Sequence, residues 1–167
     1  MIQGCPDQFC RQVHQGNDPL VFHARGTDDP QHPHGLRLRF ERDGQGVVTR
    51  FVPGDSYQGP PGIMHGGLVS TVADETAAWA LIEKTGTFGF TTSSSVKFHR
   101  PVRIGVQTAA FGQVTKQSTR IVHTAVRVEQ GGATCFTGDF SFILLDRTGA
   151  EKMLGAPLPE QWLRFAR

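Results

Sequence analysis

The sequence predicts an α+β fold in which one long central helix is wrapped by a curved antiparallel β-sheet of five to six strands. Three observations lead to this prediction. A single long apolar helical pattern follows His65-Gly66-Gly67, and two strand-like segments precede it. After the helix, the chain consists almost entirely of segments rich in β-branched and aromatic residues. Because one helix cannot cover both faces of a sheet, we expect the sheet to curl around it.

The first element is a predicted hairpin in residues 35–53. Apolar and charged residues alternate in LRLRFE, which is typical of a half-buried strand. The turn DGQG follows, and VVTRFVP returns as a second strand that ends at Pro53. Residues 1–34 are rich in Gly, Pro, Asp, Gln and His, so we interpret them as an irregular N-terminal arm.

The second element is a helix predicted from Gly67 to about Lys84. Its apolar residues cover more than a narrow stripe, so the helix should be wrapped on most sides. Gly86, just beyond its end, suits a left-handed C-cap. Asp74 lies within the apolar pattern and is expected to be buried, which is costly for a carboxylate that has no partner.

The remaining elements are four predicted strands that form an antiparallel meander and complete a domain over residues 35–146. Their sequences are FTTSSSVKFHRP, VQTAAFGQVTK, TRIVHTAVRVE and ATCFTGDFSFILLD. Residues 147–167 are interpreted as a C-terminal tail with a short helix. The outer face and the edges of such a sheet need covering, so we expect a homo-oligomer.

The composition is that of an ordinary globular protein of 167 residues, with 38% apolar residues and a net charge of +2. No nucleic-acid partner is expected. No apolar run approaches the roughly 20 residues of a membrane span, and the N-terminus lacks the pattern of a secretory signal. Three scattered cysteines argue against a disulfide framework and favour a cytoplasmic location. The Cys and His residues of the arm lack zinc-ligand spacing, so no metal or other cofactor is expected.

The start of the helix is a candidate site for acyl transfer. Helix N-termini present unpaired N–H groups and partial positive charge, and glycine allows a ligand to approach the backbone closely. Gly66 and Gly67 could therefore stabilise a carbonyl oxygen that becomes negative, although such pairs are also common in ordinary turns. Asp74 could be a nucleophile, a base that activates water, or a structural residue that bonds the backbone or another chain.

The spacing of these groups constrains the site. Gly66 and Asp74 are eight residues apart, which is about 12 Å along a helix and about 80° around it. Because hydrogen bonds reach only about 3 Å, the two residues of one chain cannot serve one carbonyl. If both act, Asp74 must come from a second subunit, and a two-fold interface would supply two mixed sites.

Three segments, QGPPGIMHGG, HGGLVSTVADETAAWA and TTSSSVKFHRPV, resemble the PaaI-like acyl-CoA thioesterases of the hotdog-fold superfamily. The resemblance spans roughly residues 35–146. Its most specific part is His-Gly-Gly with an acidic residue nine places after the histidine. It implies a hotdog fold, hydrolysis of an acyl-CoA substrate, and active sites between the subunits of dimers, which often pair into tetramers.

The resemblance also implies roles for individual residues. The Gly66 N–H would polarise the thioester carbonyl, and Asp74 of the partner subunit would be the base or nucleophile. Thr91, ten residues before Pro101, could hydrogen-bond Asp74 or orient water. His65 would hold the loop through backbone hydrogen bonds rather than act as a base.

Other residues are expected near the substrate. Gly67 lies at the helix start, and His99 and Arg100 could meet the phosphates of coenzyme A, with a solvated strand end as the alternative. Several relatives carry an Asn six residues before the histidine, where this chain has Gly59. The side chain of Gln58 could substitute for that Asn.

Two other functions remain open from the sequence. The missing Asn leaves room for an acyl-CoA or lipid-binding hotdog protein that has lost turnover. A hotdog hydratase or dehydratase is the other alternative, but those relatives usually place their catalytic histidine and acid in a different motif.

Overall fold

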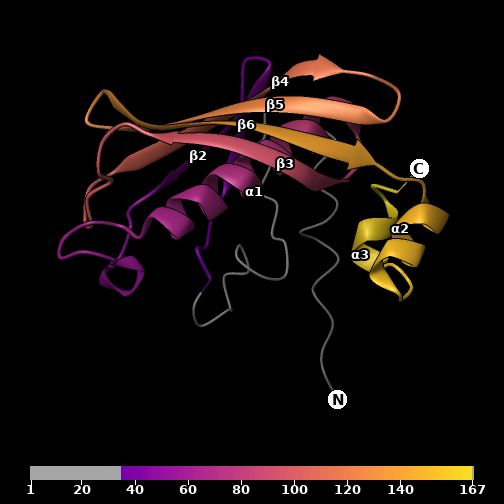
Figure 1. Cartoon of the computed structure of the whole chain (residues 1–167), viewed down its shortest axis with the longest axis horizontal. Coiled ribbons are helices and arrows are strands. Elements are labelled where there is room, and N and C mark those ends of the chain that lie inside the picture. Colours follow the sequence, from indigo (N-terminus) through magenta and orange to yellow (C-terminus); the bar gives the residue numbers. More distant parts are fainter. Residues whose placement is uncertain (1–34, 167) are drawn as a thin grey trace.

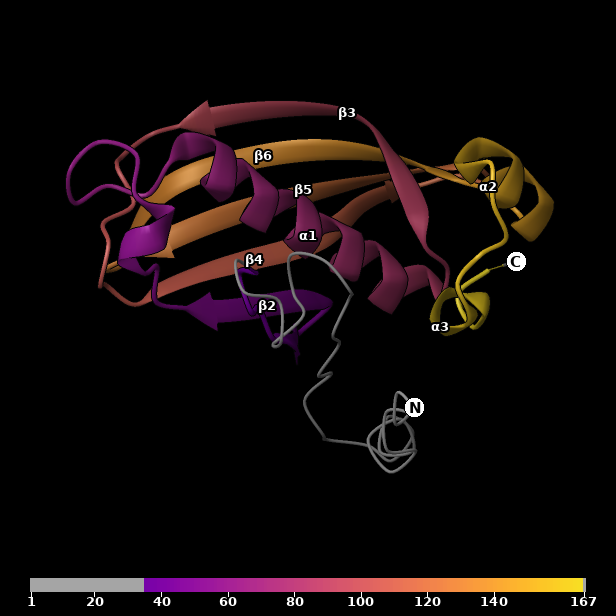
Figure 2. The same cartoon turned by 90° about the horizontal axis from the view of Figure 1, so that it is seen from below.

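The computed structural model describes residues 35–166, which form one antiparallel sheet curved around a central helix (Figures 1 and 2). The sheet has six strands in the order β1-β2-β4-β5-β6-β3. The strands are β1 (Phe40–Asp43), β2 (Gly46–Phe51), β3 (Gly89–Phe98), β4 (Thr108–Gln117), β5 (Ile121–Gln130) and β6 (Ala133–Leu144). The helices are α1 (Gly66–Thr85), α2 (Arg147–Leu154) and α3 (Glu160–Leu163). The predicted N-terminal arm, residues 1–34, lies outside the described residues.

Helix α1 lies across the concave face of the sheet, as Figure 2 shows. It begins one residue before the predicted start and ends one residue after the predicted end, and Gly86 closes it in the left-handed conformation with φ 68°. Gly112 lets α1 approach β4 closely, because a Cβ atom there would lie 2.7 Å from the carbonyl oxygen of Thr76. Within residues 35–166, no helix combines the length and apolar character needed to cross a membrane.

The first strand starts later than the sequence pattern predicts. Leu36 and Leu38 are buried, so the alternation of burial is as expected, but strand β1 begins only at Phe40. Arg37 has φ 53°, which lies in the left-handed region and interrupts the extended backbone. The prediction of a strand from residue 36 is therefore wrong, although the core positions are correct.

Strand β3 forms one edge of the sheet and is hydrogen-bonded on one side only, to β6 (Figure 2). Its residues from Thr91 to Phe98 are all exposed in the single chain. An exposed strand edge of this length offers unpaired N–H and C=O groups to another chain. The β3 edge of the sheet is thus open to association with another chain.

The C-terminal segment contains two short helices instead of the one predicted, and it packs on the core. The ring of Trp162 lies 5.6 Å from that of Phe88, and the ring of Phe165 lies 6.4 Å from that of Trp79. The Phe88 N–H also donates to the Phe165 carbonyl at 3.1 Å. These contacts close the end of the core where α1 stops (Figure 1).

Candidate active site

Asp74 lies on the side of α1 that faces strand β3. The Thr91 hydroxyl donates a hydrogen bond to the Asp74 Oδ1 atom at 2.9 Å, so the two residues meet within one chain as predicted. Asp74 is half-buried in the single chain, which corrects the expectation of full burial. Burial raises the pKa of Asp74 and the Thr91 hydrogen bond opposes this, with a net upward shift. A carboxyl group with a raised pKa is better suited to general-base chemistry near neutral pH.

The first turn of α1 leaves one N–H group open. The His65 Nδ1 atom accepts the Gly67 N–H at 3.0 Å, and the His65 carbonyl accepts the N–H groups of Leu68 and Val69. Among the described residues, the N–H of Gly66 therefore has no acceptor in this first turn. The open amide is at the residue that the resemblance assigns to the thioester carbonyl.

His65 positions this amide by capping the helix. Its ring accepts the Gly67 N–H, so Gly67, which the sequence places near the substrate, has its N–H already occupied. The His65 N–H itself donates to the Tyr57 carbonyl at 2.8 Å. An imidazole nitrogen accepts a hydrogen bond only when it carries no proton, so this cap requires Nδ1 to be unprotonated.

Phe98 is a neighbour of Gly66 that no sequence motif singles out. A Cβ atom at position 66 would lie 3.3 Å from the Phe98 Cε1 atom, and the Phe98 side chain is 57% exposed. The ring packs edge-to-face on Phe136 at 5.1 Å. In the sequence, Phe98 is simply an aromatic residue at the end of a predicted strand, and such residues more often belong to the hydrophobic core.

The loop before the helix explains the departure at position 59. A Cβ atom on Gly59 would lie 3.2 Å from the Cα atom of His65, so a larger side chain there would press on the capping histidine. The Gln58 Oε1 atom accepts the Gly62 N–H at 2.6 Å. The carbonyl oxygen of the Gln58 side chain is thus committed to the loop.

His99 and Arg100 follow strand β3 but differ in surroundings. The His99 Nε2 atom lies 2.8 Å from the Thr137 hydroxyl, and Thr137 belongs to the face of β6 that points away from α1. Arg100 is exposed, and its N–H donates to the Cys135 carbonyl at 3.1 Å. The structure therefore does not bring the His99 ring to the side of the sheet where Gly66 lies.

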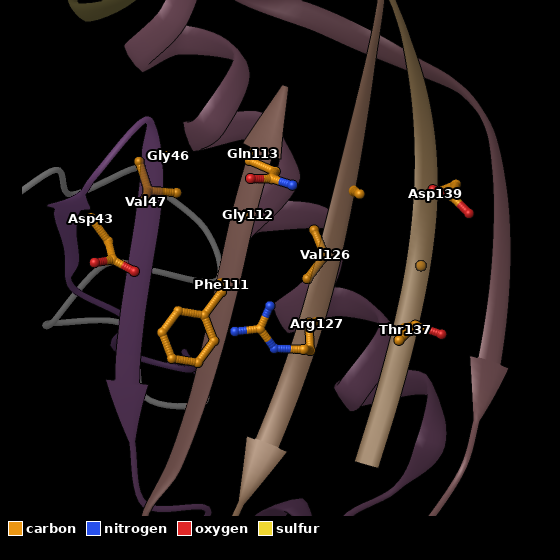
Figure 3. A pocket seen from close by; sticks show the side chains of 12 residues that line it. Asp43, Gly46, Val47, Phe111, Gly112, Gln113, Val126, Arg127, Thr137 and Asp139 are labelled. Atoms are coloured by element: carbon orange, nitrogen blue, oxygen red, sulfur yellow. The ribbon is translucent and has the colours of Figure 1, made fainter. Parts of the chain in front are cut away.

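A hollow of about 380 Å³ lies on the outer face of the sheet, away from Gly66 and Asp74 (Figure 3). Phe111 and Arg127 lie side by side there on neighbouring strands, with the guanidinium carbon 4.7 Å from the ring centroid. Arg127 is also paired with Glu129. Asp74, Gly66 and Thr91 do not line this hollow, so it is separate from the candidate active site.

A family model described as the thioesterase superfamily matches residues 61–136. This range contains His65, Gly66, Asp74 and Thr91. Over this range the chain is similar to the thioesterase superfamily. Acyl-coenzyme A thioesterase THEM4 from Xenopus laevis is 29% identical to it over 82 residues, which are 49% of this chain and 36% of that protein. The match thus spans little more than a third of this relative's length.

Solved structures of other proteins share the fold. Thioesterase superfamily member 2 from zebrafish aligns with a TM-score of 0.64 and 18% identity, over 71% of this chain and 91% of that chain. A mutant of the phenylacetic acid degradation protein PaaI from Thermus thermophilus aligns with a TM-score of 0.60 and 20% identity, over 66% and 95%. These alignments confirm the predicted hotdog fold.

Proposed function

We propose that this chain is a member of the thioesterase superfamily and hydrolyses acyl-CoA thioesters at a site shared by two copies of the chain. In each site, the Gly66 N–H of one copy binds the thioester carbonyl oxygen, and Asp74 of the other copy drives the attack. The observation that carries this proposal is the open Gly66 amide at the N-terminus of α1. The half-buried Asp74 carboxyl, held by Thr91, supplies the second group that the reaction needs.

The chemistry follows from these two groups. Attack on the carbonyl carbon places negative charge on its oxygen, which the Gly66 N–H and the helix dipole stabilise. Acting as a base, Asp74 takes a proton from water while the water oxygen bonds to the carbonyl carbon. The carbon–sulfur bond then breaks, and the thiolate takes a proton to leave as free coenzyme A. Acting as a nucleophile, Asp74 would form an anhydride that water hydrolyses to the same products.

A shared site is supported by the geometry of α1. Both residues lie in the same helix, so they remain about 12 Å apart along its axis and cannot meet one carbonyl within a chain. Asp74 bonds Thr91 on the exposed edge strand β3. A second copy that covers this edge could bring its own Gly66 amide to Asp74. We therefore propose a homodimer, or a dimer of dimers, as the active form.

An acyl-CoA substrate is favoured by the name of the Xenopus relative and by the exposed Arg100, which lies two residues after Phe98, a neighbour of Gly66. Hydrolysis is tested by incubating the purified protein with acetyl-, octanoyl-, dodecanoyl- and benzoyl-CoA and measuring free thiol. Asp74→Asn should lose most of any activity found. An unchanged rate in this variant would refute the assigned mechanism.

Binding of acyl-CoA without turnover is the second candidate, and position 59 favours it. Gly59 cannot supply a side-chain donor, and the Gln58 side chain, although it keeps its NH2 donor, is tied to the loop through its Oε1 atom. Loss of one such donor elsewhere typically costs about 10²–10³-fold in rate. Tight binding of acyl-CoA with no thiol release over hours would establish this alternative.

Sharing of the site is tested with two complementary variants. Gly66→Pro removes the amide hydrogen at the first helical position, where proline is tolerated. His65 has φ −59° and ψ 130°, which suits a residue before proline. In a co-refolded equal mixture of Gly66→Pro and Asp74→Asn chains, about half of the dimers are hybrids with one intact site of two.

The mixture should therefore recover about a quarter of the wild-type activity, while each variant alone stays inactive. As a control, the two variants are refolded separately and then combined, so that any recovery of activity without exchange of subunits becomes visible. If the co-refolded mixture is no more active than its two components, the site is not shared.

A further inference from the structure

Phe98 presents an aromatic ring that the fold of one chain leaves open. Among the described residues, it has the largest exposed fraction of the large apolar side chains, 57%. The ring packs against Phe136, which is fully buried. The ring also lies beside Gly66, whose lack of a side chain leaves space between the ring and the open amide. An exposed aromatic ring is suited to contact a ligand with mixed apolar and polar character.

The chain that follows Phe98 runs along the loop of the candidate site. The Met64 N–H donates to the Val102 carbonyl at 2.8 Å, and the Ile104 N–H donates to the Gly62 carbonyl at 3.1 Å. These bonds hold residues 102–104 against the loop that leads into α1. The backbone around Arg103 therefore lies next to the loop that leads into α1.

This part of the chain is basic. The sequence KFHRPVRIG, residues 97–105, contains four basic residues and no acidic one. Arg100 and Arg103 are exposed, and within residues 35–166 neither has a carboxylate partner within salt-bridge distance. Two unpaired guanidinium groups offer a binding surface for phosphate groups.

The order of these features matches the order of groups along coenzyme A. Its thioester lies at one end, its phosphates lie at the other, and the pantetheine arm, with its methyl and amide groups, connects them. A carbonyl at Gly66 and phosphates near Arg100 and Arg103 would place the arm between them, over the Phe98 ring. The acyl group must then extend in another direction from Gly66.

We propose that Phe98 forms the wall for the pantetheine arm, on the thiol side of the thioester, and therefore contributes to recognition of coenzyme A rather than of the acyl group. This inference rests on the proposed hydrolysis of acyl-CoA at Gly66. Phe98 is a binding residue in this scheme, and the reacting atoms remain with Gly66 and Asp74.

The test compares Phe98→Ala with Val96→Ala, which changes another exposed apolar residue of the same strand. For Phe98→Ala, KM should rise about tenfold and to the same extent for acetyl-, octanoyl-, dodecanoyl- and benzoyl-CoA, with kcat within about twofold of wild type. Titration calorimetry with coenzyme A alone should show the same loss of affinity. Val96→Ala should change neither quantity by more than about twofold.

Two results would overturn the proposal. A rise in KM that depends on the acyl group would place Phe98 in an acyl pocket, and unchanged binding of coenzyme A would remove the arm contact. Circular dichroism shows whether Phe98→Ala is folded. If it is not, Phe98→Leu is measured in the same way with a smaller expected loss.

The calorimetry also separates this proposal from the proposed function. If wild type binds coenzyme A and releases no thiol from any substrate, hydrolysis fails while the role of Phe98 is still tested. If wild type does not bind coenzyme A, both proposals fail.

Discussion

Removal of the Thr91 hydroxyl should shift the pH dependence of hydrolysis in a definite direction. Thr91→Val keeps the shape of the side chain and removes the donor that bonds the Asp74 Oδ1 atom at 2.9 Å. This bond favours the ionised carboxylate and lowers the pKa of Asp74, against the larger effect of burial. Without it, the pKa of Asp74 rises further, and the acid limb of kcat/KM should move to higher pH.

The size of the effect follows from the exposure of the pair. A hydrogen bond to a buried charged group contributes about 1.5–3 kcal/mol. Thr91 is exposed and Asp74 is half-buried in the single chain, so solvent screening reduces this to about 1 kcal/mol. Both base and nucleophile require the ionised carboxylate, so kcat/KM should fall about fivefold on the acid limb and converge with wild type at high pH.

The assay is thiol release at low substrate concentration over the pH range in which the protein stays folded. Thr92→Val provides a matched control, because the Thr92 hydroxyl donates to the Ser141 carbonyl at 3.0 Å and not to Asp74. An acid limb that stays in place, or moves to lower pH, in Thr91→Val would refute the reasoning. An equal loss of activity at every pH would show that Thr91 orients the attacking water instead.

Three further variants test the site and the fold. Asp74→Asn should lose about 10²–10⁴-fold in rate, yet its melting temperature at about pH 8 should equal or exceed that of wild type. The pKa of Asp74 is raised in the folded state, so the folded protein binds more protons than the unfolded chain between the two pKa values. The free energy of unfolding therefore falls as the pH rises through this range, and Asp74→Asn avoids that loss. A melting temperature below that of wild type at about pH 8 would contradict this. His65→Ala should lose about 1 kcal/mol in urea unfolding by removing the cap on Gly67, and His65→Asn should restore most of it. Gly112→Ala should cost about 1–3 kcal/mol, because the new methyl group would displace the helix backbone at Thr76; an unchanged midpoint would show that α1 moves without penalty.

The ends of helix α1 could be predicted within one residue because both ends have local signals. The glycines after His65 mark its start, and Gly86 marks its end. The sequence pattern places strand β1 too early for an equally local reason. Alternating apolar residues report which side chains are buried, and Leu36 and Leu38 are indeed buried, but they do not report the backbone conformation of Arg37.

Some features of the candidate site also have local signals in the sequence, and others do not. Gly66 and Asp74 could be chosen as candidates from the sequence because they lie in one segment with an unusual composition. The contact between Phe98 and Gly66 joins residues 32 positions apart, and an exposed aromatic residue has the same appearance in a sequence as a buried one. The capture of the Gly67 amide by His65 depends on the side-chain orientation of the histidine, which no spacing specifies. These contacts required the three-dimensional structure.

The position of Asp74 links its reactivity to assembly. In the single chain, its carboxyl is half-buried and its partner Thr91 lies on an open strand edge. A second copy that covered this edge would remove more water from the carboxyl, and desolvation raises the pKa of an acid. The same event would deliver the Gly66 amide that one chain cannot bring to its own Asp74, because helix geometry keeps the two apart. Under the proposed mechanism, the base would reach its working environment only when the carbonyl-binding amide is also in place.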